Sequence, residues 1–190
     1  ASSRGVWLPG LAGLDPRLAM LAGIRASPDL DVEAVVRSGR LESGKLALRA
    51  RDARIVERAW FAREIALRDV ALDARVSADF KRVEIERLDL DIAGPKLRVT
   101  GSIEDLLARP RLRARAELTD LATEKLIELW PIFAPPNPVI WIAENISGGR
   151  VPQARAEVEL AARDANWSGA ALGRFRLDFA VRGADVTYVE

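Results

Sequence analysis

The stretch RLRARAEL, residues 111–118, determines the fold class that we expect for this chain. Leucine and alanine occupy every second position in it, and arginine and glutamate occupy the positions between. Successive side chains of a β-strand point to opposite faces of the sheet. A strand formed by this stretch therefore has one apolar face and one charged face.

The same alternation recurs over most of the chain. Clear runs cover residues 88–92, 154–160 and 174–182, and weaker runs cover residues 32–36, 46–50, 65–67, 70–76, 83–85 and 97–99. Turn-forming pairs separate the runs, at Ser38-Gly39, Ser43-Gly44, Gly94-Pro95, Arg109-Pro110 and Arg182-Gly183. Such short links predict antiparallel pairing, because parallel neighbours need long crossover connections. The alternation slips at Arg68-Asp69, which predicts a bulge or tight turn there.

Two short helices are expected near residues 120–147. Thr119-Asp120 is a capping pair for the first helix, and Pro131 would end it. The second helix would begin after Asn137, with Pro138 at its first position, and end at Gly148-Gly149. The expected fold is thus mainly β with minor α: a strongly curved antiparallel sheet that forms an open apolar groove, with these two helices beside it.

Residues 1–190 are expected to be one segment of a longer, repetitive β domain. Residues 1–29 would form a mixed start, with a short helix within residues 11–24 capped by Asp15. Residues 30–118 and 150–190 would form antiparallel strands, and residues 119–149 a helical insert. Val186 and Tyr188 still alternate near the end of the chain. We therefore expect the sheet to continue in the longer protein.

The composition limits the possible functions. Apolar residues make up 49% of the chain and charged residues 30%, which suits a folded domain. The formal net charge is +1, without a long run of like charges, which argues against a nucleic-acid-binding surface. The chain contains no cysteine and no histidine. Disulfides, thiolate metal sites, cysteine nucleophiles and the commonest general base are therefore excluded.

No catalytic motif is recognisable, and we expect neither enzymatic activity nor a cofactor. Asp89 and Asp91 lie on the charged side of a predicted strand, where solvation explains them best. Asp178 stands among arginines, as in a cross-strand charge ladder. Glu144 is more simply a surface residue of the second helix. A metal site built from scattered carboxylates stays open, although no clustered spacing supports one.

The apolar side of the strands has two interpretations. It is either the closed core of an ordinary sandwich or barrel, or a face left open for an apolar ligand. About ten strands against two or three short helices favour the open face. The candidate residues for such a face are Leu46, Leu48, Ile65, Leu67, Val70, Leu72, Leu88, Leu90, Ile92, Leu97, Val99, Leu112, Leu118, Val158, Leu160, Phe175, Leu177, Phe179 and Val181.

The segment that follows residue 129 resembles a motif of the AsmA-like superfamily, and within it of the YhdP group. In that motif a helix ends at a Trp-Pro pair, a second helix carries a tryptophan, and a glycine turn leads into a strand. The matching residues are Trp130, Pro131, Pro135, Trp141, Asn145, Gly148 and Gly149. The closing GADVTY, residues 183–188, is similar to a strand that follows the motif in these proteins.

The resemblance implies a location and a function. Such proteins are anchored in the inner membrane of Gram-negative bacteria by an N-terminal helix and extend across the periplasm. Their proposed role is to conduct phospholipid acyl chains between the inner and outer membranes along a hydrophobic groove. The implied partners are phospholipids, the membranes at the two ends of the full-length protein, and neighbouring repeats of the same chain. TamB-like relatives imply an alternative, a non-catalytic scaffold or outer-membrane assembly module.

Overall fold

A single open antiparallel sheet dominates the structure, which is a computed structural model. It describes residues 2–14, 21–38, 40–58, 60–79, 81–106, 108–164, 167 and 170–187. The strands are β1 (Ser2–Ser3), β2 (Ile24–Arg25), β3 (Asp29–Arg37), β4 (Arg40–Ile55), β5 (Ile65–Ser77), β6 (Arg82–Asp91), β7 (Lys96–Glu104), β8 (Arg111–Ala122), β9 (Ile146–Ala161), β10 (Ala171–Phe179) and β11 (Arg182–Val186). The prediction of a mainly β chain is confirmed.

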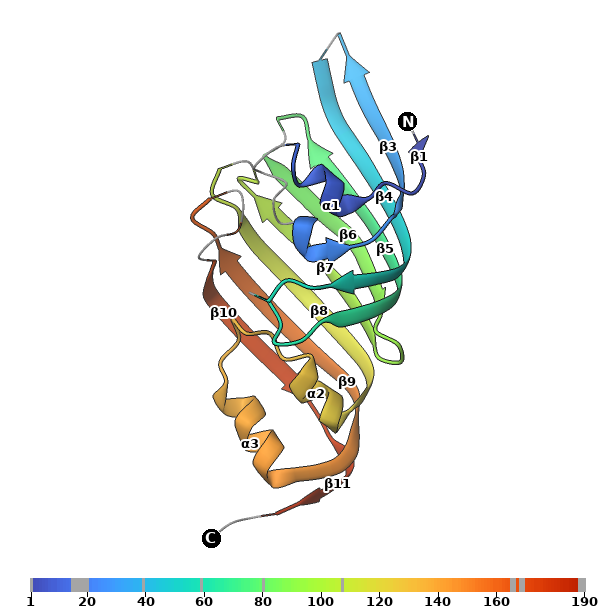
Figure 1. The fold of residues 1–190 in the computed structure, drawn as a ribbon. Helices are drawn as coiled ribbons and strands as arrows, with labels where there is room; N and C mark the ends of the chain where they lie inside the picture. The colour runs from blue at the N-terminus through green and yellow to red at the C-terminus, as the bar shows by residue number, and fades with distance from the viewer. Residues whose placement is uncertain are drawn as a thin grey trace.

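The strand order follows the chain almost throughout. It runs β1-β3-β4-β5-β6-β7-β8-β9-β10, while β2 pairs with β4 and β11 with β9. Every pairing in this part of the chain is antiparallel, as the short links predict. Among the described residues no pairing joins β1 to β10, so the sheet is not closed. Figure 1 shows the strands side by side in this order.

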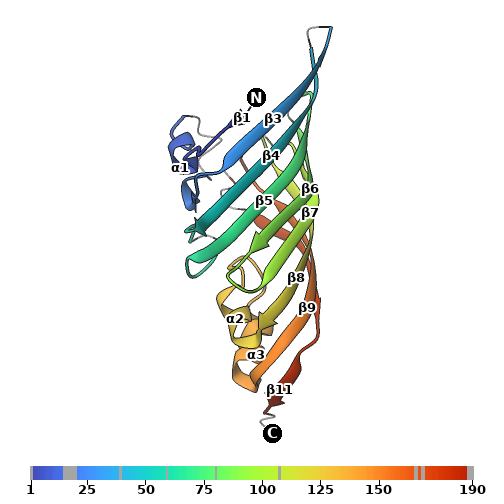
Figure 2. The same cartoon turned by 90° about the vertical axis from the view of Figure 1, so that its right-hand side faces the viewer.

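Three short helices lie on the same side of the sheet (Figures 1 and 2). They are α1 (Leu8–Leu11), α2 (Thr123–Glu128) and α3 (Asn137–Asn145). Figure 2 shows α1 near the β1 end of the sheet, and α2 and α3 near the β9 end. We call the side that carries the helices the apolar face and the other side the charged face.

Two separate clusters of buried side chains hold the helices to the sheet. The first contains Leu8 of α1, Ala26 just after β2, and residues of β4 and β5: Ala50, Ala53, Ile65 and Leu67. The second contains Leu126 of α2 and Ile142 of α3 with residues of β8 and β9: Leu121, Leu126, Ile142, Val151 and Ala154. Most of the buried apolar side chains among the described residues therefore belong to two clusters, one that includes α1 and one that includes α2 and α3.

Opposite charges face each other in rows across the charged face. Asp29, Arg49, Ala71, Asp89, Arg98, Glu117, Arg155 and Asp178 are successive cross-strand partners from β3 to β10. Opposite charges at facing positions stabilise a sheet, and like charges destabilise it. A slip of one residue would move this row to the apolar face, so the pattern specifies the register.

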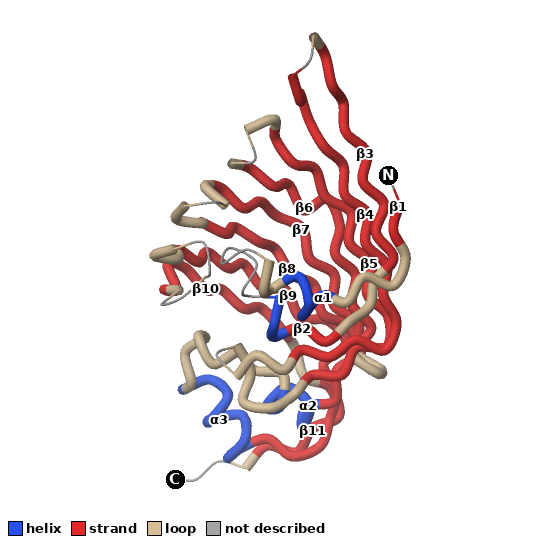
Figure 3. Tube along the Cα trace, turned by 45° about the horizontal axis from the view of Figure 1, so that its top comes forward, coloured by secondary structure: helices blue, strands red, loops and turns tan. Residues whose placement is uncertain are grey.

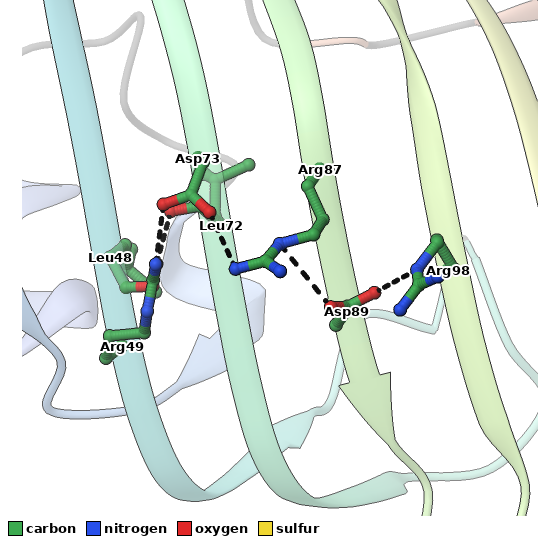
Figure 4. A network of polar contacts seen from close by, with 7 residues as sticks. All are labelled: Leu48, Arg49, Leu72, Asp73, Arg87, Asp89 and Arg98. Atoms are coloured by element: carbon green, nitrogen blue, oxygen red, sulfur yellow. Dashed lines mark hydrogen bonds and ion pairs between the residues drawn. The ribbon is translucent and has the colours of Figure 1, made fainter.

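Part of the charged face forms one connected network on β4 to β7 (Figure 4). Asp73 accepts hydrogen bonds from Arg49 at 2.6 Å and from Arg87 at 3.1 Å. Arg87 also lies 3.5 Å from a carboxylate oxygen of Asp89, which accepts a hydrogen bond from Arg98 at 2.8 Å. The hydrogen bond from Arg49, with smaller contributions from Arg87, holds the pKa of Asp73 below its ordinary value of 3.8.

Acidification is expected to weaken the sheet through Asp73. A carboxyl group with a lowered pKa stabilises the folded state fully above its ordinary pKa, and this contribution is lost as the pH falls through the folded-state value. Below about pH 4, the Tm of the unsubstituted chain should therefore fall more steeply than that of Asp73→Asn. Thermal unfolding followed by circular dichroism measures this difference. Asp69→Asn is the control. The Asp69 carboxylate lies 3.8 Å from Arg51, whereas the Asp73 carboxylate lies 2.6 Å from Arg49. An unchanged slope in Asp73→Asn would contradict the prediction.

The phase slip predicted near Arg68-Asp69 is present, and it is shared by two strands. The β4–β5 register pairs Arg51 with Asp69 and Ala53 with Leu67, with no pair at the rung between them. Asp52, on this rung, has a φ of 52°. Ala50 and Ala53 are both buried, so the apolar phase changes here on β4. Beyond this point the ends of β4 and β5 turn across the apolar face (Figure 3).

The start of α2 differs from the expectation. Thr119 and Asp120 belong to β8, and the residue before the helix is Ala122, which makes no side-chain capping bond. Asp120 forms an ion pair with Arg150 of β9 instead. The ion pair with Arg150 thus holds Asp120 in the strand. At the other end of α2, Pro131 follows the helix as expected.

The other two helices also differ in their bounds. α3 begins at Asn137, but it ends at Asn145, before Gly148-Gly149. Both glycines lie in β9 with positive φ, and Gly148 pairs with Ala184 of β11. A helix was expected within residues 11–24. In the structure α1 covers Leu8–Leu11, so it ends where the expected helix would begin, and Ile24 lies in β2. Residues 15–20 lie outside the described residues.

Candidate functional site

Four rows of apolar residues run side by side across the apolar face. We name each row by its residue on β7. Every step within a row is a direct cross-strand pair. The Leu97 row is Ala50, Val70, Leu90, Leu97, Leu118, Ala154 and Phe179; the Val99 row is Leu30, Leu48, Leu72, Leu88, Val99, Ala116, Ala156 and Leu177. The Gly101 row is Val32, Leu46, Ala74, Ile85, Gly101, Ala114, Val158 and Phe175; the Ile103 row is Ala34, Gly44, Val76, Val83, Ile103, Leu112, Leu160 and Leu172.

The rows are only partly buried. Ala50, Ala74 and Ala154 are their three buried members, and every larger side chain in them remains half-buried or exposed. No charged residue interrupts any row. Exposed apolar patches of more than a few hundred Å² are uncommon on monomers and mark binding surfaces. The apolar face is therefore a continuous apolar surface that the helices only partly cover.

Most of the candidate residues predicted from the sequence lie in these rows. Four of them do not. Ile65 and Leu67 are buried in the first cluster, beneath α1. Ile92 follows β6 and packs against that cluster, and Val181 follows β10 and packs against the second cluster. The rows contain Leu46, Leu48, Val70, Leu72, Leu88, Leu90, Leu97, Val99, Leu112, Leu118, Val158, Leu160, Phe175, Leu177 and Phe179.

A cavity of about 200 Å³ lies on the apolar face between the two buried clusters. Its sheet side consists of Leu90, Leu97, Ala116, Leu118, Ala154, Ala156, Val158, Phe175 and Leu177, all members of the rows. Ile55, Phe61, Ile65, Leu67, Ile92, Leu126, Leu129, Trp130, Pro131 and Phe133 complete the lining. All of these side chains are aliphatic or aromatic, so the cavity offers an environment for hydrocarbon.

Two connecting segments meet above this part of the face. The β4–β5 connection and the α2–α3 connection form an isolated β-bridge between Phe61 and Pro131. The backbone N–H of Ile132 also donates to the carbonyl oxygen of Trp60 at 2.9 Å. We call these contacts the crossing. Phe61 and Phe133 were not predicted as site residues. Their only signal was their aromatic type in a connection, because no local pattern shows that the two segments meet.

The motif residues have different surroundings. Trp130 and Pro131 line the cavity. The indole N–H of Trp130 donates to the carbonyl oxygen of Pro135 at 3.1 Å. Trp141 lies on α3 and is 48% exposed, and Asn145 donates to its carbonyl oxygen at 2.8 Å. Gly148 and Gly149 lie opposite β11. Only the first half of the motif therefore contributes to the cavity.

The charged face carries side chains that mainly contact each other. A depression of about 630 Å³ there is bordered by residues such as Glu84, Thr100 and Arg113. Beside it Arg115 lies 3.4 Å from Glu157. Across the described residues, no group of three or more acidic residues has the geometry of a metal site. The charged face is therefore a solvent-exposed surface of paired charged side chains.

The comparisons with known proteins found no matching family model, curated protein or solved structure. In the part of the chain that the structure describes, no helix is both long and apolar enough to cross a bilayer.

Proposed function

We propose that the apolar face holds the hydrocarbon chains of lipids, and that the chain is a periplasmic segment of an AsmA-like protein of the YhdP type. In this role it conducts phospholipid between the inner and outer membranes along an open groove formed by the four rows. The observation that carries the proposal is the continuity of the rows. Three rows run from β3 to β10 and the Leu97 row runs from β4 to β10. All four are unbroken by charge, and their larger side chains remain partly exposed.

The energetics suit this role. A hydrocarbon chain loses about 0.8 kcal/mol per CH₂ group on transfer to water. A face that stays apolar from strand to strand removes most of this cost at each position along it. The eight strands of the Val99 row, at roughly 4.8 Å spacing, cover roughly 34 Å. This length exceeds the half-bilayer of about 15 Å that one acyl chain fills, because the whole hydrocarbon core measures about 30 Å. A lipid can therefore shift along the face without leaving it.

Leu112→Glu is expected to reduce the lipid bound to the purified chain by about tenfold or more. The substitution puts a carboxylate into the Ile103 row between Ile103 and Leu160, where burial under hydrocarbon carries a large desolvation cost. Without lipid the carboxylate remains hydrated, so the chain should still fold. Mass spectrometry of extracted phospholipid measures the loss, and circular dichroism checks the fold.

Arg113→Glu is the matched control. Arg113 is the next residue on β8 and lies on the charged face, and it is exposed. The control should retain the wild-type amount of lipid. Equal lipid in both variants, with both folded, would contradict the proposed function.

One observation favours the alternative, a non-catalytic envelope scaffold or assembly module. The chain's own side chains fill part of the apolar face, where Trp130 of the α2–α3 connection contacts Phe175 of β10. For a scaffold, the purified chain would carry no phospholipid, and Leu112→Glu and Arg113→Glu would behave alike. The same experiment therefore separates the two functions.

A further inference from the structure

The crossing divides the apolar face into an open part and a roofed part. The Ile103 row lines no part of the cavity, whereas the Val99 and Gly101 rows pass into it at β8 to β10 through Ala116, Ala156, Val158, Phe175 and Leu177. Val158 pairs directly with Phe175 in this region. The roofed part is thus continuous with the open part through the same rows. Whatever binds along the rows on β8 to β10 meets the crossing.

Trp130 reaches from the crossing down to the sheet. Its ring lies edge-on to the ring of Phe175, with the centroids 6.0 Å apart and the planes at 74°. This is the arrangement that aromatic pairs prefer. The hydrogen bond from the indole N–H to Pro135 fixes the orientation of the ring. Pro131, Pro135 and Pro136 restrict the backbone of the same connection. Trp130 therefore has a defined position in the cavity wall.

The sheet side of the cavity is shaped by small residues. Ala116 and Ala156 pair with each other across β8 and β9, and Ala154 lies two residues from Ala156 on β9. All three line the cavity opposite the large side chains of the crossing. Alanine at these positions leaves the space that a leucine or methionine would occupy. The cavity therefore depends on both the small sheet residues and the position of Trp130.

The size and chemistry of the cavity restrict its occupant. The volume of about 200 Å³ is below the roughly 300–1,000 Å³ of pockets that enclose drug-sized ligands. The side chains that line it include no charged group, and the indole N–H of Trp130 already has an acceptor. A lipid headgroup would find no side-chain partner in the lining. The space suits part of one unbranched hydrocarbon chain, which is narrower than a rigid fused-ring lipid.

We propose that the cavity beneath the crossing, in whose wall Trp130 packs against Phe175, is an aperture that admits a single unbranched hydrocarbon chain and excludes fused-ring lipids. Trp130 is the specificity-determining residue of this aperture, and Ala156 sets its depth. The inference rests on the proposed function, because it names the class of lipid chain that the apolar face accepts.

Competition binding with two radiolabelled probes, palmitate and cholesterol, tests the aperture. The unsubstituted chain should bind palmitate and at least tenfold less cholesterol. Trp130→Ala removes the indole and should bring cholesterol binding to within about threefold of palmitate binding. Ala156→Met fills the cavity from the sheet side and should lower palmitate binding about tenfold, the loss that 1.4 kcal/mol of overpacking produces. Ala47→Met is the control, because Ala47 pairs with Asp31 and Asp73 on the charged face and lies outside both the rows and the cavity lining. It should bind both probes as the unsubstituted chain does.

A second design tests the crossing while residue 130 keeps an aromatic side chain. Phe61→Cys with Pro131→Cys places two thiols at a bridged antiparallel pair, where the Cα atoms lie within the range that a disulfide spans. The chain has no other cysteine, so the oxidised and reduced forms differ only in this bond. The oxidised form should retain the preference for palmitate when it also carries Trp130→Phe.

The outcomes separate the two proposals. If the unsubstituted chain binds cholesterol as well as palmitate, or if Trp130→Ala and Ala156→Met leave the ratio unchanged, the aperture is wrong while the lipid-binding face stands. If the unsubstituted chain binds neither probe and carries no phospholipid, the proposed function fails with it. If Trp130→Ala does not fold, Ala156→Met and the cysteine pair still decide the inference.

Discussion

Gly101→Ala is expected to destabilise the chain by about 3 kcal/mol, at the upper end of the usual cost of overpacking. Gly101 lies in β7, near the middle of the sheet, opposite Ala114 of β8. A Cβ atom at Gly101 would overlap the carbonyl oxygen of Arg113 and lie 2.8 Å from the Cα of Ala114. These are backbone atoms, so a side-chain rotation cannot relieve the overlap. The two strands would have to move apart.

The Tm should fall by roughly 6–12 °C, because 1 kcal/mol corresponds to about 2–4 °C in a chain of this size. Gly44→Ala is the matched control. Gly44 also lies within a strand of the apolar face, but its nearest neighbour would be the carbonyl oxygen of Glu33, 3.6 Å away, an ordinary contact. Alanine there should be neutral or raise the stability by about 0.5 kcal/mol through the unfolded state. Equal Tm values for the two variants would show that β7 and β8 do not approach as closely as described.

The faces of the sheet were predictable from the sequence because the pattern that encodes them is local. Side chains two residues apart in a strand share a face, so the run ending at Leu118 shows its apolar and charged sides directly. The pairing then places Arg98 opposite Glu117 and Asp89, as the alternation of charges along neighbouring runs requires. The slip at Arg68-Asp69 was visible for the same reason.

The roof of the cavity was not predictable, because it depends on contacts between distant segments. Phe61 and Pro131 are 70 positions apart, and neither belongs to an alternating run. Phe61 lies in the connection between β4 and β5, and β4 changes its apolar phase at Asp52, a non-glycine residue with a positive φ that no local rule selects. The cap assigned to Thr119-Asp120 failed for a similar reason. A partner on β9, 30 residues away, holds Asp120 more effectively than the start of a short helix does.

Leu121→Ala is expected to cost about 3 kcal/mol, whereas Leu160→Ala should cost about 1 kcal/mol or less in lipid-free protein. Leu121 is 0% exposed in the second cluster, where it pairs with Val151 and lies beneath α2 and α3. Its truncation leaves a cavity that the surrounding strands and helices cannot fill. Leu160 lies in the Ile103 row and is only partly buried. Its truncation exposes little new surface and leaves no closed void.

The pair of leucines also tests whether the apolar face is a core or a binding surface. Denaturant unfolding of the delipidated chain measures both costs. Equal losses of about 3 kcal/mol would mean that the rows are packed as a closed core, which contradicts the proposed groove. For an open face, the loss of unfolding free energy in Leu160→Ala should be small without lipid and should rise when phospholipid is added. Lipid bound to the folded state stabilises it in proportion to its affinity, and Leu160→Ala removes part of the surface that the hydrocarbon covers. Leu121 lies beneath the helices, so the cost of Leu121→Ala should not change with lipid.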